Sequence, residues 1–172
     1  ILCGYGRVGQ EISNQIKTQN IPIIVVESDE DRKKIAEDNG LEVLCADATL
    51  DETLKLAGLD KCKSLVVTLP NDAANLYVVL SAKGIRSTIR VIARAGTEEA
   101  ASKLRLAGAS IVVSPYIAAG RAMASMALRP IAIDFLDLLA GSECEIEEFE
   151  LSNDISLFET AEKITLLELG IG

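Results

Sequence analysis

Short apolar segments recur at regular intervals along the sequence, and each is followed by a stretch with helical periodicity. Six of them, ILC, IPIIVV, LEVLC, SLVV, IRVIA and SIVV, have the length of β-strands. The run 23–26 is apolar on both faces, which is typical of a parallel strand covered by helices on both sides. Strands that alternate with helices and are joined by right-handed crossovers predict an α/β fold with a doubly wound parallel sheet.

Capping and breaking residues indicate where the elements begin and end. Thr49 followed three residues later by Glu52 is typical of a capping box, and Gly84 is expected to end the next helix. Leu80 is expected to face inward from that helix. After the first strand, the expected strands lie within 21–29, 41–49, 64–72, 89–95 and 110–116, and the helices begin near residues 7, 28, 49, 72, 97 and 117.

Three glycines directly after the first strand give the sequence its strongest functional signal. Gly4, Gly6 and Gly9 have the spacing at which the first glycine makes a tight turn, the second admits a phosphate to the backbone, and the third lets the helix pack closely. Glu27 ends the second strand, where a carboxylate binds ribose hydroxyls and repels a 2′-phosphate. The pattern predicts a Rossmann-like site for NAD or an adenine nucleotide, and a turn needed only for packing is the alternative.

Other charged residues follow the predicted strands at the same edge of the sheet. Asp47 follows the third strand, where its carboxylate would accept a hydrogen bond from an adenine amino group or make a helix-entry turn. Arg7 lies inside the glycine-rich turn, where a guanidinium can bind phosphate, although an exposed arginine is the alternative. Arg94 ends the fifth strand and gives a weaker signal of the same kind.

Composition excludes several classes of function. The net charge of −9 disfavours nucleic acid and anionic membrane surfaces, and no apolar run is long enough to span a membrane. The chain contains no histidine and no CxxC pair, so we expect no zinc site and no Cys/His nucleophile, and we interpret the four cysteines as reduced core residues. Without a histidine or a domain to cover a nicotinamide, a sensor is favoured over an NAD-dependent reductase, which is the alternative.

The motifs together resemble the RCK (regulator of potassium conductance) or TrkA-N family. CGYGRVG, VVESDEDR, ADAT, LPNDAANL and AGASIVVSP stand in the family's order, and the resemblance spans residues 1 to about 165. It implies an N-terminal lobe over 1–140, which includes a pair of dimerising helices, and an incomplete second α+β lobe over 141–172. It assigns the following residues to the nucleotide: Gly4, Tyr5, Gly6, Arg7, Val8, Gly9, Glu27, Ser28, Asp47, Ala48, Thr68, Leu69 and Arg94.

The resemblance also implies partners and a location. It implies a cytoplasmic domain that forms homodimers and then an octameric gating ring, and that gates potassium transport through a membrane pore attached before Ile1. ALRPIAIDFLDLL is more similar to ligand-gated prokaryotic potassium channels than to the peripheral subunits of Trk or Ktr transporters, which are the alternative. The ligand stays open among NAD, NADH, ADP and ATP. The helices over 117–139 are expected to form the dimer through Ala118, Ala119, Ala122, Met123, Ala124, Met126, Ile131, Phe135 and Leu138.

The resemblance also raises the question of whether calcium binds to this chain. Calcium-gated channels of this family carry carboxylates just after the fifth strand, whereas this chain has Arg94 and Gly96 there and only Asp72 nearby. Calcium binding at this place is therefore not expected. Glu145, Glu147, Glu148 and Glu150 offer oxygen ligands elsewhere, but their alternation with apolar residues favours a solvated strand face.

Overall fold

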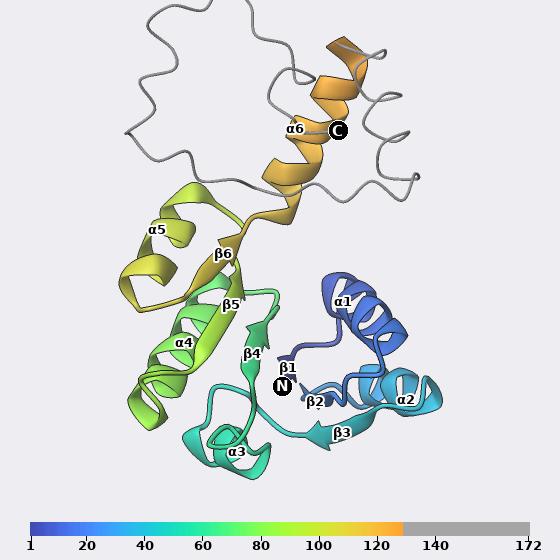
Figure 1. The fold of residues 1–172 in the computed structure, drawn as a ribbon, viewed down its shortest axis with the longest axis vertical. Coiled ribbons are helices and arrows are strands. Elements are labelled where there is room, and N and C mark those ends of the chain that lie inside the picture. The colour runs from blue at the N-terminus through green and yellow to red at the C-terminus, as the bar shows by residue number, and fades with distance from the viewer. Residues whose placement is uncertain (129–172) are drawn as a thin grey trace, which may run out of the picture. The chain divides into compact units, whose positions relative to one another are not determined.

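The computed structural model describes residues 1–128, and these fold as six parallel strands that alternate with six helices (Figure 1). The strands are β1 (Leu2–Cys3), β2 (Ile24–Glu27), β3 (Glu42–Cys45), β4 (Ser64–Val67), β5 (Arg90–Arg94) and β6 (Ile111–Val113). The helices are α1 (Arg7–Thr18), α2 (Glu30–Asp38), α3 (Asp51–Leu56), α4 (Asp72–Ile85), α5 (Glu98–Leu106) and α6 (Pro115–Leu128). The boundary expected at residues 140 and 141 and the second lobe lie outside the described residues.

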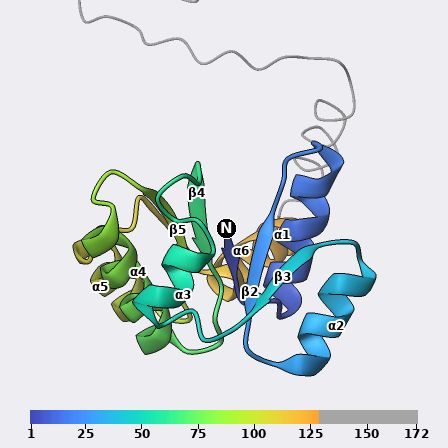
Figure 2. The ribbon, with the colours of Figure 1, turned by 90° about the horizontal axis from the view of Figure 1, so that it is seen from below.

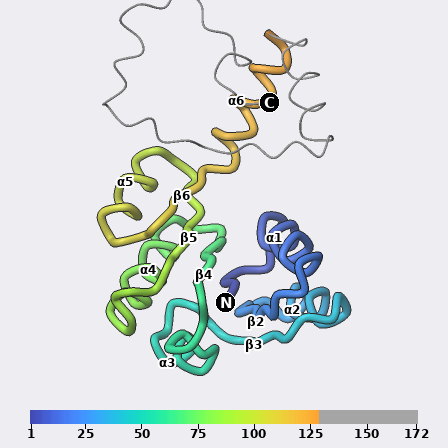
Figure 3. The backbone as a smooth tube through the Cα atoms, in the orientation of Figure 1, coloured from blue at the N-terminus to red at the C-terminus, as the bar shows by residue number. Residues whose placement is uncertain are grey.

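The sheet has the strand order β3-β2-β1-β4-β5-β6, so the direction of winding reverses between β1 and β4. The chain moves outward from β1 to β3 and then crosses back to β4, a path that Figure 3 follows. Helices α1 and α2 cover one face of the sheet, and α3, α4 and α5 cover the other (Figure 2). This is the doubly wound parallel sheet that the sequence predicts, and ligands of such sheets bind at the carboxyl ends of the strands beside the reversal.

Each face of the sheet has its own apolar core. On the side of α1 and α2, Leu2, Tyr5 and Val25 are fully buried or nearly so. The opposite side holds the larger cluster, which is centred on strands β4 and β5 and on the inner face of α4. The two-residue strand β1 contributes one side chain to each core, since Leu2 lies in the first cluster and Cys3 in the second.

Three local predictions on α3 and α4 are wrong. Thr49 and Glu52 do not form a capping box, because Leu50 is the N-cap residue of α3 and Thr49 bonds instead to the carboxylate of Asp47. Gly84 does not stop α4, because it does not adopt the left-handed conformation of a terminating glycine, and the helix continues to Ile85 with Arg86 as its C-cap residue. Leu80 is about half exposed rather than inward, since the buried face of α4 is formed by positions 75, 78, 79 and 82.

The prediction for the cysteines holds only in part. Cys3 is completely buried, and burial raises the pKa of its thiol to about 12. Cys45 is exposed instead of buried, because it lies on the edge strand β3, beyond which no further strand pairs in the described sheet. Cys62 is half-buried, and Cys144 lies outside the described residues.

Candidate functional site

The turn between β1 and α1 has the geometry that its three glycines predict. Gly4 has a φ of +92°, a conformation that disfavours any other residue. A side chain at Gly9 would overlap the carbonyl oxygen of Gly4, so this glycine is needed where α1 packs against the turn. Gly6 differs from both, because its φ of −74° and ψ of −171° suit any residue, and among residues 1–128 no atom beyond its two chain neighbours lies within 4 Å of a Cβ placed there.

Helix α1 begins at this turn without the features that usually satisfy a helix N-terminus. Gly6 is its N-cap residue and supplies no side-chain hydrogen bond, and the first turn contains no acidic residue. Helices α2 to α5, by contrast, each carry an acidic residue in the first turn. The first N–H groups of a helix have no partner within it, and they attract anions. The exposed Arg7, the first residue of α1, adds a positive charge at the same place.

Strand β2 brings Glu27 directly against the turn. One carboxylate oxygen, Oε2, accepts a hydrogen bond from the backbone N–H of Tyr5 at 2.6 Å, and Oε1 accepts one from the N–H of Asp29 at 3.0 Å. The side chain is buried, and Glu27 as a whole is only 5% exposed. Ser28, the next residue, is exposed.

Strand β4 holds the turn from the other side. The hydroxyl of Thr68 lies 3.1 Å from the carbonyl oxygen of Cys3 and 3.0 Å from that of Gly4, to which it donates. Leu69 follows, and its side chain lies 3.2 Å from the position that a Cβ on Gly4 would take. The turn is therefore fixed between Glu27 and Thr68, at the reversal point of the sheet.

Asp47 and Arg94 lie at the same edge but make other contacts. Oδ1 of Asp47 accepts hydrogen bonds from both the N–H and the hydroxyl of Thr49, at 2.8 Å each, so one oxygen serves the helix-entry turn and the residue is exposed. Ala48 beside it is buried. The guanidinium of the half-buried Arg94 donates to the carbonyl of Leu69 at 3.2 Å and lies near the ring of Tyr116 on α6. Arg94 ends β5, and β4 lies between this strand and β1, which leads into the glycine turn.

Sequence reasoning missed Asn75, which organises the edge between β4 and β5. Its side chain is completely buried, accepts from Leu69 N–H at 2.9 Å, and donates to the carbonyls of Leu69 and Arg94 at 3.0 Å each. The sequence offered one signal. Asn75 precedes apolar Leu76 on the expected helix, and an amide side chain that is buried there needs hydrogen-bond partners.

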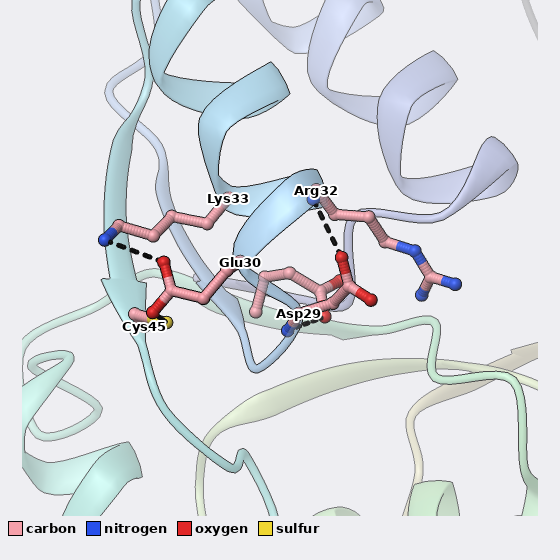
Figure 4. A network of polar contacts seen from close by, with 6 residues as sticks. Asp29, Glu30, Arg32, Lys33 and Cys45 are labelled. Atoms are coloured by element: carbon pink, nitrogen blue, oxygen red, sulfur yellow. Dashed lines mark hydrogen bonds and ion pairs between the residues drawn. The ribbon is translucent and has the colours of Figure 1, made fainter.

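An acidic segment follows Glu27 at the start of α2. Asp29 caps the helix by accepting from Arg32 N–H at 2.9 Å, and Glu30 pairs with Lys33 at 3.2 Å (Figure 4). The thiol of Cys45 donates to Glu30 at 3.2 Å. This bond raises the pKa of the Cys45 thiol, and together with Lys33 it lowers the pKa of the Glu30 carboxyl.

The geometry beyond β5 gives no positive sign of a cation. One oxygen of Asp72 accepts a hydrogen bond from Gly96 N–H at 2.9 Å. Within residues 1–128, no group of three or more His, Cys, Asp or Glu side chains has the arrangement of a metal site. The prediction about calcium at this position remains untested, and the acidic residues 145–150 lie outside the described part. No helix among the described residues is long and apolar enough to cross a membrane.

Two hollows lie along α4, away from the glycine turn. One is lined by Asp72, Leu76 and Thr97 among others, and the second by Thr49, Asn71 and Tyr77 among others. Neither includes any residue expected to bind the nucleotide.

Comparison with known proteins agrees with this arrangement. Residues 1–115 match the TrkA-N domain family, and they include the glycine turn, Glu27 and the β4 edge. The chain belongs to the TrkA-N domain family. A "Probable potassium channel protein 2" from Methanocaldococcus jannaschii is 38% identical over 160 residues, which are 91% of this chain and 46% of that protein. The chain thus spans about half the length of this curated relative.

Solved TrkA-N structures have the same fold. The TrkA-N domain of the inner membrane protein YbaL from Escherichia coli is 30% identical and has a TM-score of 0.69, and the match covers 73% of this chain and 93% of that one. YbaL is also named a putative cation/proton antiporter. The GsuK channel bound to NAD is 30% identical with a TM-score of 0.65, over 73% of this chain and 22% of the channel chain. GsuK has also been solved with ADP.

Proposed function

We propose that this domain is a ligand-sensing regulator of potassium transport, which binds NAD(H) or an adenine nucleotide such as ADP or ATP at the carboxyl ends of β1, β2 and β3. Gly6 carries the proposal. Neither the backbone conformation nor the packing of the described residues requires a glycine there, so its lack of a side chain serves an atom from outside this part of the chain. The N–H groups at the start of α1 and the guanidinium of Arg7 suit a phosphate at that place.

The remaining contacts are assigned from the same geometry. The phosphates meet the N–H groups of Gly6, Arg7 and Val8, and the ribose lies toward Glu27, which has unused lone pairs on both carboxylate oxygens. The adenine lies toward Asp47 and Ala48, and Thr68 and Leu69 form the opposite wall. Structures of GsuK with NAD and with ADP support this class of ligand.

The regulated pore and the assembly form a further part of the proposal. The domain works on the cytoplasmic side of the membrane as a homodimer within an octameric ring, and the ligand changes the geometry that the ring imposes on a potassium channel. Similarity to the M. jannaschii channel protein supports a channel, and similarity to YbaL favours the second candidate, a regulatory domain of a cation antiporter. The absence of histidine from the sequence supports regulation instead of catalysis.

Substitution of Gly6 tests the site. Binding of ADP, ATP, AMP, NAD and NADH is measured by titration calorimetry with wild type, Gly6→Ala and Gly6→Val. We expect wild type to bind at least one of them and Gly6→Val to lose at least about tenfold in affinity, because its side chain occupies the place of the phosphate, while thermal unfolding changes little. Unchanged affinity in Gly6→Val, or no binding by wild type, would refute the proposed site.

A further inference from the structure

The carboxylate of Glu27 holds the glycine turn before any ligand is present. Its contact with Tyr5 N–H is a buried bond between an ionisable side chain and the backbone, 2.6 Å long, and it joins the end of β2 to the residue between Gly4 and Gly6. Hydrogen bonds from backbone N–H groups to a carboxylate are among the stronger ones in proteins. Glu27 therefore has a structural partner in addition to the ribose expected from its position.

Tyr5 is held at its other end as well. Its ring is completely buried in the core under α1 and α2, and its hydroxyl receives a hydrogen bond from the side-chain amide of Asn39 at 3.2 Å. The carbonyl of Tyr5 accepts from the side chain of Gln10 at 3.2 Å. The bond from Tyr5 N–H to Glu27 fixes the Gly4–Tyr5 peptide, and the Gln10 bond to the Tyr5 carbonyl fixes the next peptide, which carries the Gly6 N–H. The two peptides meet at the Cα of Tyr5, so Glu27 contributes to where the Gly6 backbone lies.

We propose that Glu27 is a positioning residue for the phosphates of the ligand, acting through Tyr5 on the backbone at Gly6. The inference rests on the proposed nucleotide site and deepens it, since it assigns to Glu27 an effect on ligands that contain no ribose. A turn already held in its binding conformation loses less entropy when a diphosphate binds. Without the Glu27 bond, the Gly4–Tyr5 peptide keeps the bond from Thr68 to the Gly4 carbonyl but loses its partner at the Tyr5 N–H, so the backbone leading to Gly6 is held less tightly.

The sign of the effect separates this role from simple electrostatics. A carboxylate near an anionic ligand repels it, so removal of the charge alone would strengthen phosphate binding. Loss of the Tyr5 bond would weaken it. Glutamine at position 27 has nearly the same shape but only one oxygen, so it cannot accept from both Tyr5 N–H and Asp29 N–H through separate oxygens.

Inorganic pyrophosphate is the probe, because it contains the diphosphate without the ribose. Its affinity and that of ADP are measured by calorimetry for wild type, Glu27→Gln, Glu27→Ala and the control Glu30→Gln. Glu30 is an exposed carboxylate three residues further along, whose hydrogen bonds among residues 1–128 go to Lys33 and Cys45 and not to the turn. Its replacement by glutamine removes the same charge as Glu27→Gln. We expect Glu27→Gln to bind pyrophosphate about tenfold more weakly than wild type, and Glu30→Gln to bind it equally well or slightly more tightly.

The opposite pattern overturns the inference. If Glu27→Gln and Glu27→Ala both bind pyrophosphate as tightly as wild type and lose affinity only for ADP, Glu27 contacts the ribose alone. If wild type binds none of pyrophosphate, ADP, ATP, NAD and NADH, the proposed nucleotide function fails.

Amide hydrogen exchange tests the positioning step separately and without ligand. Tyr5 N–H should exchange at least about tenfold faster in Glu27→Ala, which removes both acceptor oxygens, while Gly4 N–H, which donates to Val26 O at 2.9 Å, should keep its rate. Equal acceleration of both amides would mean general destabilisation, and an unchanged Tyr5 rate would mean that the bond does not hold the turn. Either of these results refutes the positioning role.

Discussion

The guanidinium carbon of Arg94 lies 5.6 Å from the centre of the Tyr116 ring, within the range of a cation–π contact. The contact joins the end of β5 to the first turn of α6. Because Nη1 of Arg94 also donates to the carbonyl of Leu69, the same side chain connects α6 with the β4 edge of the candidate site. The Nε atom of Arg94 is buried and has no hydrogen-bond partner among the described residues.

We expect Arg94 and Tyr116 to stabilise the domain together. In a double-mutant cycle with Arg94→Met and Tyr116→Leu, the interaction free energy should be about 0.5–1 kcal/mol, the size of a partly exposed cation–π contact. Arg94→Met alone should cost more than Tyr116→Leu, since it also removes the bond to Leu69. Urea unfolding of the four proteins measures this, and additive effects would show that the contact is without energetic consequence.

Replacement of Asn75 should destabilise the domain more than replacement of Asn71, which lies one helical turn earlier. Asn75→Ala removes three hydrogen bonds of a completely buried side chain and takes away the side-chain acceptor of the Leu69 N–H, so we expect a loss of about 2–3 kcal/mol in the free energy of unfolding. Asn71→Ala removes only the exposed cap of α4 and should cost about 1 kcal/mol. Equal losses in urea unfolding would contradict the role assigned to Asn75.

Helix α6 should be stabilised by a second copy of the chain. None of its residues is buried in the described part, and Met123 and Met126 are largely exposed, whereas an isolated helix of 14 residues is marginal in water. We expect a dimer in sedimentation equilibrium that Met123→Glu weakens by at least about tenfold, a typical effect of placing a charge in an apolar interface. Leu56→Glu, at an equally exposed apolar residue of α3, is the control and should leave the dimer intact.

The reactivity of Cys45 should depend on Glu30. The hydrogen bond to the Glu30 carboxylate raises the pKa of the Cys45 thiol, so its thiolate forms at higher pH than in an ordinary cysteine. In Glu30→Gln, the midpoint of the pH–rate profile for alkylation should fall, and the rate at pH 8 should rise. Mass spectrometry of the Cys45 peptide follows the reaction, and an unaltered profile would contradict the bond. Cys3, with a pKa of about 12, should stay unmodified in the folded protein.

The fold could be predicted because its determinants are local and repeated. Short apolar runs alternate with helices, and glycine is the one residue that readily adopts the conformation at position 4 and fits the space at position 9. The end of β2 at Glu27 was also predictable, because the apolar run stops there. In each case the neighbouring sequence carries the whole signal.

The contacts between strands could not be predicted in the same way. The bond from Glu27 to Tyr5 spans 22 residues, and those of Asn75 depend on β4 and β5 lying side by side. Thr49 had the right spacing for a capping box, but the Thr49 hydroxyl donates to the carboxylate of Asp47 instead. Cys45 lies in an apolar run, and only the strand order shows that this run is an edge.

The difference between Gly6 and the other two glycines of the turn has an evolutionary consequence. Gly4 and Gly9 are required for the chain to reach its folded shape, so purifying selection acts on them in any descendant that stays folded. Gly6 is free of that constraint among the described residues. In a library selected only for soluble expression, position 6 should therefore drift while positions 4 and 9 keep glycine. In a descendant that no longer binds the ligand, position 6 should be the first of the three to lose its glycine.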